Sequence, residues 1–237
     1  DAHEITRGTQ EQMLQLADLV TLQARTQLES QNAVLRTRMV PVTTVAARLH
    51  RAVRQTGRLL DKEVELVLKG AETLIDGNLL THLVDAHMHV LRNAVDHGIE
   101  PAERRLAAGK DPVGHIELAF RREGDVTIVT CRDDGRGLDL EQIRQQAHRR
   151  GLVGDTGALS DDQIARFILA PGFSTREGAT QVSGRGIGLD AVNAMVEELK
   201  GSIALRTHHG AGLLVEIRLP TTLLSVQALL TRSGGTM

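Results

Sequence analysis

The longest regular pattern of apolar residues in the chain follows Asp76. Its members recur at the three- and four-residue spacing of one helix face, at Leu80, Leu83, Val84, Leu91, Ala94 and Val95. Such a stripe predicts an amphipathic helix with one buried face. Asp76 is expected to cap its N-terminus, because a short acidic side chain can accept hydrogen bonds from the first free amides of a helix.

Other segments alternate between apolar and polar residues, as strands with one buried face do. The segments 115–122 and 126–132 are expected to form a hairpin around Glu123-Gly124-Asp125. The residues predicted to share a face are Ile116, Leu118 and Phe120 on the first strand, and Thr127, Val129, Cys131 and Asp133 on the second. Further strands are predicted at Glu63–Leu68 and, as a last hairpin, at Ile203–Thr207 and Leu213–Leu219.

Helical patterns surround these strands. Gln10–Thr37 contains neither glycine nor proline, and Pro41 is expected to interrupt the helix before it resumes at Thr43–Gly57. Polar residues interrupt the apolar stripe of the first helix, which argues against a long regular coiled coil. Further helices are predicted at Asp139–Arg150, after a capping box that opens at Ser160, and at Gly186–Leu199, which Gly201 is expected to end.

These elements predict an α/β fold in which residues 62–220 form a layer of helices packed on a sheet, a two-layer α/β sandwich. A helical segment, residues 1–60, precedes it. Beyond Pro220, Leu223–Leu230 is one apolar strand without a partner, and it looks like the start of another domain.

Composition narrows the classes of function. The 28 basic and 30 acidic residues nearly cancel, which argues against nucleic acid as the main partner. No apolar run is long enough to span a bilayer, and the N-terminus has no signal-peptide pattern, so neither membrane insertion nor secretion is expected. Cys131 is the single cysteine; it excludes an internal disulfide and fits a reducing compartment.

His89, Asn93 and His97 occupy every fourth position and should share one face of the long helix. The amide oxygen of Asn93 is the kind of ligand that Mg²⁺ accepts while phosphates and water fill most of its shell. In isolation the same asparagine would more often be an amide that is exposed or bonded to the local backbone, and the other three motifs favour the magnesium role. Zinc on the histidines is the less favoured alternative, because no cluster of cysteine or carboxylate accompanies them.

Asp133 ends a predicted strand and is followed by Gly135 and Gly137, as in Asp133-Asp134-Gly135-Arg136-Gly137. A carboxylate can accept a hydrogen bond from the 6-amino group of adenine, whereas guanine presents a carbonyl oxygen there, so this residue should favour ATP over GTP. The glycines let the backbone turn sharply beside the base. The alternatives are an ordinary Asp-Gly turn, or Asp134 taking this role in a shifted register.

Two further motifs follow in the chain. Gly184-Arg185-Gly186-Ile187-Gly188 lies directly before a predicted helix, where glycine amides and the helix N-terminus can bind an anion. The loop from Gly151 to Ser183 is rich in Gly, Ser and Thr and resembles a lid. In Pro171-Gly172-Phe173-Ser174-Thr175, Phe173 is predicted to act as an apolar latch, and Ser174 and Thr175 to donate to the terminal phosphate; the alternative is a plain surface loop.

The four motifs occur in the order found in chemotaxis-type histidine kinases, and the chain resembles that family from about residue 30 to residue 230. More broadly, the site resembles the ATPase fold of gyrase, heat-shock chaperone and mismatch-repair proteins. The first motif, His89-x-x-Arg92-Asn93-Ala94-x-Asp96-His97-Gly98-Ile99-Glu100, is a close match. Arg38-Met39-Val40-Pro41 resembles the end of the family's dimerisation domain, in the form seen in kinases that control pilus-based motility.

The resemblance implies three parts: a helical dimerisation segment at 1–60, an ATP-binding catalytic domain at 61–220, and the start of a regulatory, adaptor-coupling domain at 221–237. It implies a cytoplasmic homodimer that uses ATP and Mg²⁺ to phosphorylate a histidine on a separate phosphotransfer domain. A response regulator and a receptor–adaptor complex are the further partners implied.

The resemblance also assigns roles. Catalysis is assigned to His89 and Asn93, and Asn93 is the metal ligand. The residues expected to bind the nucleotide are His89, Asn93, Asp96, His97, Asp133, Gly135, Gly137, Phe173, Ser174, Thr175, Gly184, Arg185, Gly186, Ile187 and Gly188. His89 stands where gyrase-like ATPases place a water-activating glutamate. An acceptor imidazole is already nucleophilic near neutral pH and needs no such base. The absence of the glutamate should therefore restrain futile hydrolysis.

Some residues depart from the family pattern. Ala86-His87 stands where relatives often carry Pro-Leu, and His82 and His87 are interpreted as structural. Gln142 and Gln146 stand where relatives often carry basic residues, so a catalytically weak ATP-binding interaction module is one alternative function. A gyrase-type hydrolytic ATPase is the other, which the missing glutamate disfavours.

Overall fold

The computed structural model describes residues 13, 18–27, 37–152, 159–173, 188–208 and 210–221. The chain divides into two compact units, Asp1–Val40 and Pro41–Met237. In the first unit residues 18–27 are helical, as predicted, and the strand β1 (Met39–Pro41) spans the boundary. The rest of the helix predicted at Gln10–Thr37 and the strand predicted at Leu223–Leu230 lie mostly or wholly outside the described residues.

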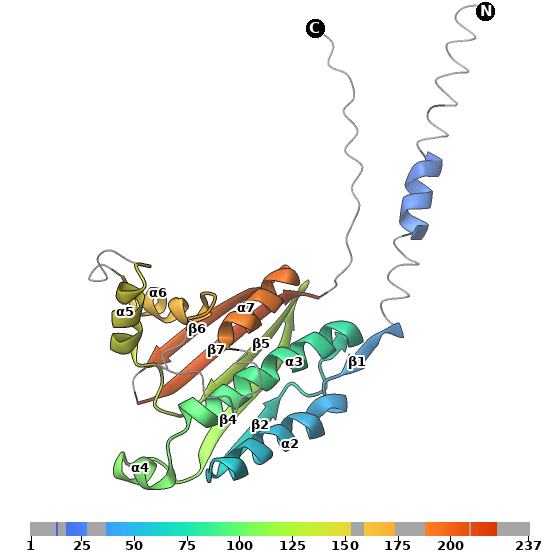
Figure 1. The fold of residues 1–237 in the computed structure, drawn as a ribbon. Coiled ribbons are helices and arrows are strands. Elements are labelled where there is room, and N and C mark those ends of the chain that lie inside the picture. Colours follow the sequence, from blue (N-terminus) through green and yellow to red (C-terminus); the bar gives the residue numbers. More distant parts are fainter. Residues whose placement is uncertain are drawn as a thin grey trace, which may run out of the picture. The chain divides into compact units, whose positions relative to one another are not determined.

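The second unit is built on one five-stranded sheet with the order β2-β4-β5-β7-β6 (Figure 1). The strands are β2 (Val64–Lys69), β4 (Gly114–Glu123), β5 (Val126–Asp133), β6 (Ser202–His208) and β7 (Gly212–Pro220). Only β2 and β4 are parallel, and every other neighbouring pair is antiparallel. Both predicted hairpins are therefore confirmed, as is the single strand near Glu63–Leu68.

Three helices cover one face of the sheet: α2 (Thr43–Leu59), α3 (Gly77–Asn93) and α7 (Leu189–Glu198) (Figure 1). The register of β4 and β5 places Leu118 opposite Cys131 and Ile116 opposite Asp133, so the alternating residues meet on one face. The buried residues that join the two layers include Leu79, Leu83, Val90, Ile116, Leu118, Val129, Val215 and Ile217. The two-layer α/β sandwich is thus confirmed.

The remaining elements connect the layers. They are the short strand β3 (Leu74–Asp76), α4 (Ala102–Ala107), α5 (Leu140–Arg149), α6 (Asp161–Ala165) and the 3₁₀ turn η3 (Arg166–Leu169). The capping box at Ser160 is present, since its hydroxyl accepts from the amide of Gln163 while the Gln163 side chain accepts from the amide of Ser160. Neither β3 nor α4 is predicted by the sequence pattern, because both are too short to show a period.

The end of α7 differs in detail from its prediction. The left-handed residue is Lys200, with a φ of 59°, and the amide of Gly201 donates to the carbonyl of Val196 at 2.8 Å. This is a Schellman ending with lysine in the position that glycine usually takes. Gly201 is needed for another reason: a Cβ there would lie 2.5 Å from the carbonyl oxygen of Arg218 in β7.

The boundary between the two units also falls earlier than the segment boundary predicted after residue 60. Helix α2 belongs to the second unit, because Leu49 and Val53 are buried and the helix packs against α3 and β2. The N-terminal unit therefore ends at Val40, directly before Pro41, the residue expected to interrupt the helix.

Candidate functional site

The first motif lies at the end of α3, where the helix widens into a π turn. Asp76 caps the other end of α3 by accepting from the amides of Asn78 and Leu79, as predicted. After Asn93 the π turn η1 (Ala94–Gly98) closes with a bond from the Ile99 amide to the Ala94 carbonyl at 2.7 Å. A π turn inserts an extra residue into the helix and frequently marks a functional site.

The polar residues of this motif are accessible. His89 and Asn93 are half-buried, and the structure shows no hydrogen bond from either side chain to another described residue. The Nε2 of His97 lies 3.5 Å from the Oδ2 of Asp96. Burial lowers the pKa of His89, with Arg92 adding to the effect, so its ring is neutral near pH 7. Asn93 and His89 are thus available to an external ligand.

Asp133 lies at the end of β5 and only 4% of its surface is exposed. Its Oδ1 accepts from the amide of Gly135 at 3.0 Å and from the amide of Leu213, in β7, at 3.3 Å. Burial nevertheless raises the pKa of Asp133 to about 6, more than the two amides lower it. A buried carboxylate of this kind gains from a further hydrogen-bond donor, such as an amino group.

Close backbone packing joins the first motif to the second. A Cβ on Gly135 would lie 2.2 Å from the carbonyl oxygen of Gly98, and a Cβ on Gly98 would lie 3.1 Å from the Oδ1 of Asp133. The amide of Arg136 donates to the Gly98 carbonyl at 2.9 Å, and its Nε donates to the His97 carbonyl at 2.8 Å. Gly137 has a φ of 74° and makes the turn that the motif requires. The structure therefore brings Asp133 next to the π turn.

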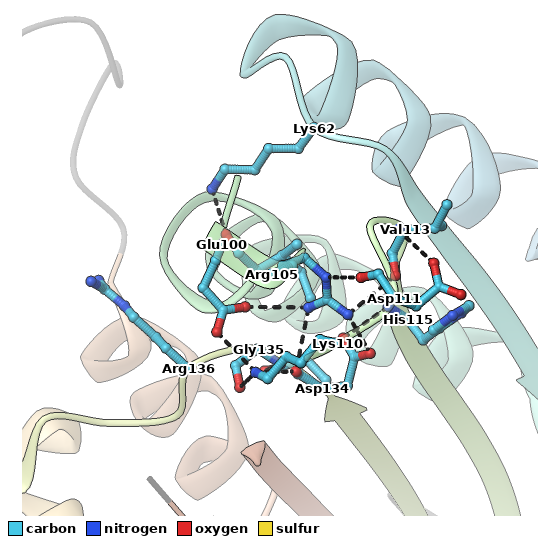
Figure 2. A network of polar contacts seen from close by, with 12 residues as sticks. Lys62, Glu100, Arg105, Lys110, Asp111, Val113, His115, Asp134, Gly135 and Arg136 are labelled. Carbon is cyan, nitrogen blue, oxygen red and sulfur yellow. Dashed lines mark hydrogen bonds and ion pairs between the residues drawn. The ribbon is translucent and has the colours of Figure 1, made fainter. Parts of the chain in front are cut away.

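Asp134 is engaged elsewhere. Its Oδ2 accepts from the Nη2 of Arg105 at 2.7 Å, and its Oδ1 accepts from the amide of His115 at 2.9 Å (Figure 2). The Arg105 side chain is completely buried and also donates to Glu100 and to the carbonyls of Asp111 and Val113. These contacts argue against the shifted register in which Asp134 replaces Asp133.

The third motif is described as far as Phe173, and the fourth only at Gly188. Phe173 is buried, 8% exposed, with its ring stacked on Phe167 and under the guanidinium of Arg150. Gly188 is the N-cap residue of α7, and the amide of Gly172 donates to the Asp190 side chain at 3.0 Å, which links the third motif to this helix. Ser174, Thr175, Gly184, Arg185, Gly186 and Ile187 lie outside the described residues.

Of the other two histidines of α3 that were interpreted as structural, only His87 is buried. His82 is exposed and His87 is fully buried, with its Nδ1 2.7 Å from the Leu83 carbonyl. In the described part of the chain no group of three His, Cys, Asp or Glu side chains is arranged to hold a metal ion. A magnesium ion held by one amide oxygen and by phosphates needs no such group.

The sequence pattern does not reveal several residues that support the site. Arg105 lies in the unpredicted helix α4, and Lys62 and Lys110 donate to backbone carbonyls of the first two motifs. Thr207, in β6, donates to the Gly212 carbonyl and accepts from the amide of Leu138, just beyond the second motif. The sequence contains one indication of these residues: lysine is rare in this arginine-rich chain, and two of its four lysines, Lys62 and Lys110, donate to backbone carbonyls of the motifs.

Comparison with known proteins identifies the family to which the chain belongs. Residues 81–223 match the family described as histidine kinase-, DNA gyrase B- and HSP90-like ATPase, and the chain belongs to that family. The chemotaxis protein CheA of Borreliella burgdorferi is 40% identical over 203 residues, which are 86% of this chain and 24% of that protein. The gliding motility regulatory protein of Myxococcus xanthus is also 40% identical over 203 residues, 85% of this chain and 26% of that protein.

These matches confirm the resemblance to chemotaxis-type histidine kinases that the four motifs indicate. Among solved structures, the catalytic domain of the histidine kinase ThkA has a TM-score of 0.47 at 13% identity, over 78% of this chain and 95% of that chain. The chain spans about a quarter to a third of the length of the curated relatives it matches. None of the described helices combines the length and hydropathy needed to cross a lipid bilayer.

Proposed function

We propose that this chain is the ATP-binding core of a chemotaxis-type protein-histidine kinase. It transfers the γ-phosphoryl group of ATP to a histidine on a separate phosphotransfer domain, which passes it to a response regulator. The observation that carries the proposal is the junction of the first two motifs, where the buried Asp133 lies against the π turn that follows Asn93. The match to the ATPase family supports ATP as the nucleotide.

Asp133 provides base recognition in this proposal. Its ionised carboxylate accepts a hydrogen bond from the adenine amino group, and the amides of Gly135 and Leu213 fix its orientation. Guanine would direct a carbonyl oxygen at the same carboxylate, and this repulsion excludes GTP. Because Gly98 and Gly135 lack side chains, the backbone beside Asp133 stays close-packed and leaves the carboxylate rigid.

Asn93 and His89 provide the phosphate end of the site. The residues present fit a magnesium ion, because the half-buried Asn93 amide has no hydrogen bond to another described residue. Bound there with the nucleotide, Mg²⁺ would neutralise phosphate charge. His89 stays neutral and is no strong base, so water near it is not activated as it would be by a glutamate.

The transfer itself needs positioning more than acid–base chemistry. The unprotonated ring nitrogen of the acceptor histidine attacks the γ-phosphorus with its lone pair, the bond to the β-phosphate oxygen breaks, and ADP leaves. This chain holds the ATP and the partner domain supplies the nucleophile. We also propose a homodimer that works in the cytoplasm with a receptor–adaptor complex, as the family relationship implies, with dimerisation through residues 1–40, the part of the predicted segment 1–60 that lies outside the second unit.

The test is phosphoryl transfer by variants of Asn93. Asn93→Ala and Asn93→Asp should abolish acid-labile labelling of a purified phosphotransfer domain from ATP labelled at the γ-position. Asn193→Ala is the matched control, because Asn193 is also half-buried but its amide is bonded to Glu197 at 2.8 Å. Full activity of a correctly folded Asn93→Ala variant would show that Asn93 does not hold the metal.

A second candidate is an ATP-binding interaction module with little catalysis. Gln142 and Gln146 lie on α5, directly after the second motif, and neither carries the positive charge expected in the family. Tight ATP binding by the wild-type chain without transfer to any phosphotransfer domain would favour this function. Steady phosphate release without an acceptor would instead indicate a hydrolytic ATPase.

A further inference from the structure

The four lysines of this chain divide into two pairs. Lys69 and Lys200 are exposed, and Lys69 forms a surface ion pair with Glu117. Lys62 and Lys110 are instead partly buried, and their ammonium groups donate to the backbone of the first and second motifs. Since the other 24 basic residues are arginines, these two positions stand out chemically.

Lys62 binds the π turn. Its Nζ donates to the carbonyls of Val95 and Asp96, both at 2.8 Å, and to the carbonyl of Ile99 at 2.7 Å. The last carbonyls of a helix have no partner within the helix and must find one elsewhere. One ammonium group satisfies three carbonyls at the end of the segment that carries Asn93 and His97.

Lys110 binds the loop of the second motif in the same way. Its Nζ donates to the carbonyls of Asp134 and Gly135 at 2.9 and 2.8 Å, and to the Oε1 of Glu100 at 2.8 Å (Figure 2). Glu100 also pairs with the buried Arg105, so the loop, the residues after the π turn and α4 form one network. Asp133 immediately precedes the carbonyls that Lys110 holds.

The same type of helix C-terminus positions both lysines. The amide of Lys62 donates to the Gly57 carbonyl at 2.9 Å after the left-handed residue Asp61, and the amide of Lys110 donates to the Arg105 carbonyl at 2.9 Å after Gly109. Each lysine is therefore the second residue beyond the C-cap of a helix, which is Leu60 for α2 and Ala108 for α4, in a Schellman motif. This ending fixes the Cα of each lysine, so its side chain reaches the site from a rigid base.

We propose that Lys62 and Lys110 are positioning residues of the phosphotransfer site. Lys62 fixes the turn after Asn93 and so supports the magnesium-dependent part of nucleotide binding. Lys110 fixes the loop after Asp133 and so supports the choice of adenine over guanine. The inference rests on the proposed function, since it assigns each lysine to one half of the proposed site.

The geometry requires lysine in particular. An ammonium group directs three donors outward from one atom, whereas a guanidinium is a planar fork with its donors in one plane. Three acceptors at 2.7–2.8 Å surround the Nζ of Lys62, and three at 2.8–2.9 Å surround that of Lys110. An arginine would keep the charge but could not satisfy either set.

The experiment compares Lys62→Arg, Lys62→Met, Lys110→Arg and Lys110→Met with Lys69→Arg, Lys69→Met and Lys200→Arg as matched controls. Calorimetry gives two ratios for each folded variant: ATP affinity with and without Mg²⁺, and ATP affinity relative to GTP. Lys62 variants should lose roughly tenfold or more in the first ratio and Lys110 variants in the second, since losing a hydrogen bond to a charged group corresponds to about a tenfold or larger change in an equilibrium constant. The controls should match the wild type.

The outcomes separate the two proposals. Absence of ATP binding by the wild-type chain would overturn the proposed function itself. Wild-type binding with both ratios unchanged in all four variants, or with both ratios lowered equally in all four, would overturn the positioning roles alone. Restoration of the wild-type ratios by arginine would show that charge, and not the ammonium geometry, is what the site needs.

The wild-type chain allows a second test in case the methionine variants do not fold. Labelling lysine with ¹⁵N gives only four ammonium signals, and Lys69→Arg and Lys200→Arg identify two of them. The ammonium groups of Lys62 and Lys110 should exchange their protons slowly and should shift when ATP and Mg²⁺ are added. Four signals that exchange rapidly and do not respond to nucleotide would contradict the inference.

Discussion

At the scale of single residues, the site depends on a carboxylate whose environment works against its charge. Asp133 is buried, and within the described part of the chain two backbone amides offset the cost of that burial. Asp134 and Glu100 raise its pKa further, although Asp134 is itself paired with Arg105. The ionised carboxylate of Asp133 therefore lowers the stability of the nucleotide-free protein, and it is available to accept a hydrogen bond from the nucleotide.

The sign of this effect gives a prediction for Asp133→Asn. Because the folded pKa of about 6 lies above the unfolded value of 3.8, the stabilising contribution of Asp133 is complete below 3.8 and is lost as the pH rises through 6. The asparagine variant should thus be at least as stable as the wild type at pH 7. It should bind ATP roughly ten- to a hundredfold more weakly, since a hydrogen bond to a charged group contributes about 1.5–3 kcal/mol.

Wild-type ATP affinity should also fall as the pH drops below about 6, because the adenine amino group requires the ionised form. Calorimetric titrations from pH 5 to 8 and chemical denaturation check both statements. Asp125→Asn is the matched control, since Asp125 is exposed on a hairpin turn. Unchanged ATP affinity in Asp133→Asn would remove Asp133 from base recognition.

At the scale of elements, the packing of α3 on the sheet contains one unfavourable group. His87 is fully buried near Phe120 of β4, with ring centroids 6.2 Å apart. Its Nδ1–H donates to the Leu83 carbonyl, and its Nε2 has no partner among the described residues. Burial lowers the pKa of His87 to about 4, so the ring is neutral inside the fold.

This histidine should make the protein sensitive to acid. Between pH 6.5 and 4 the unfolded chain binds a proton that the folded chain does not, so stability is lost as the pH falls. At pH 5 the loss from this group should be about 2 kcal/mol, and His87→Leu should remove it. Chemical denaturation of the wild type, His87→Leu and the exposed control His82→Leu at pH 7 and 5 measures the difference. Equal pH dependence in all three would show that His87 is not buried as a neutral ring.

The same elements show what a sequence can and cannot predict here. The α3 stripe and the alternation of β4 and β5 repeat several times, so the buried faces were predicted correctly, including Asp133 on the inner face. The π turn follows α3 without any change of period, and the six residues of α4 are too few to show one. Contacts such as those of Lys62 with Val95 and Ile99 join distant segments through backbone carbonyls, which leave no mark on the pattern of side chains.

At the scale of the whole molecule, the chain consists of two units, of which the second contains the described part of the proposed site and the first has exposed apolar side chains. The second unit contains the sheet, its covering helices and the described part of the proposed site. The first unit contains the helical residues 18–27, where Leu19, Val20 and Leu22 are each more than 60% exposed. Exposed apolar side chains on a helix gain from a partner surface, and in the proposed homodimer the matching helix of a second copy supplies it.

Deletion of residues 1–40 should therefore separate association from nucleotide binding. The remaining residues 41–237 should stay monomeric in sedimentation at every concentration, because the exposed apolar positions of the first unit are gone. The complete chain should associate weakly and reversibly, since the stripe of its first helix is short and interrupted by Gln23 and Gln27. ATP affinity should be equal in both proteins, because the described site residues all follow Pro41.

Replacing Leu19 and Leu22 by Gln in the 237-residue chain tests the same helix without a deletion and should give the same monomer. Association that survives in residues 41–237 would place the dimer contact on the catalytic unit instead.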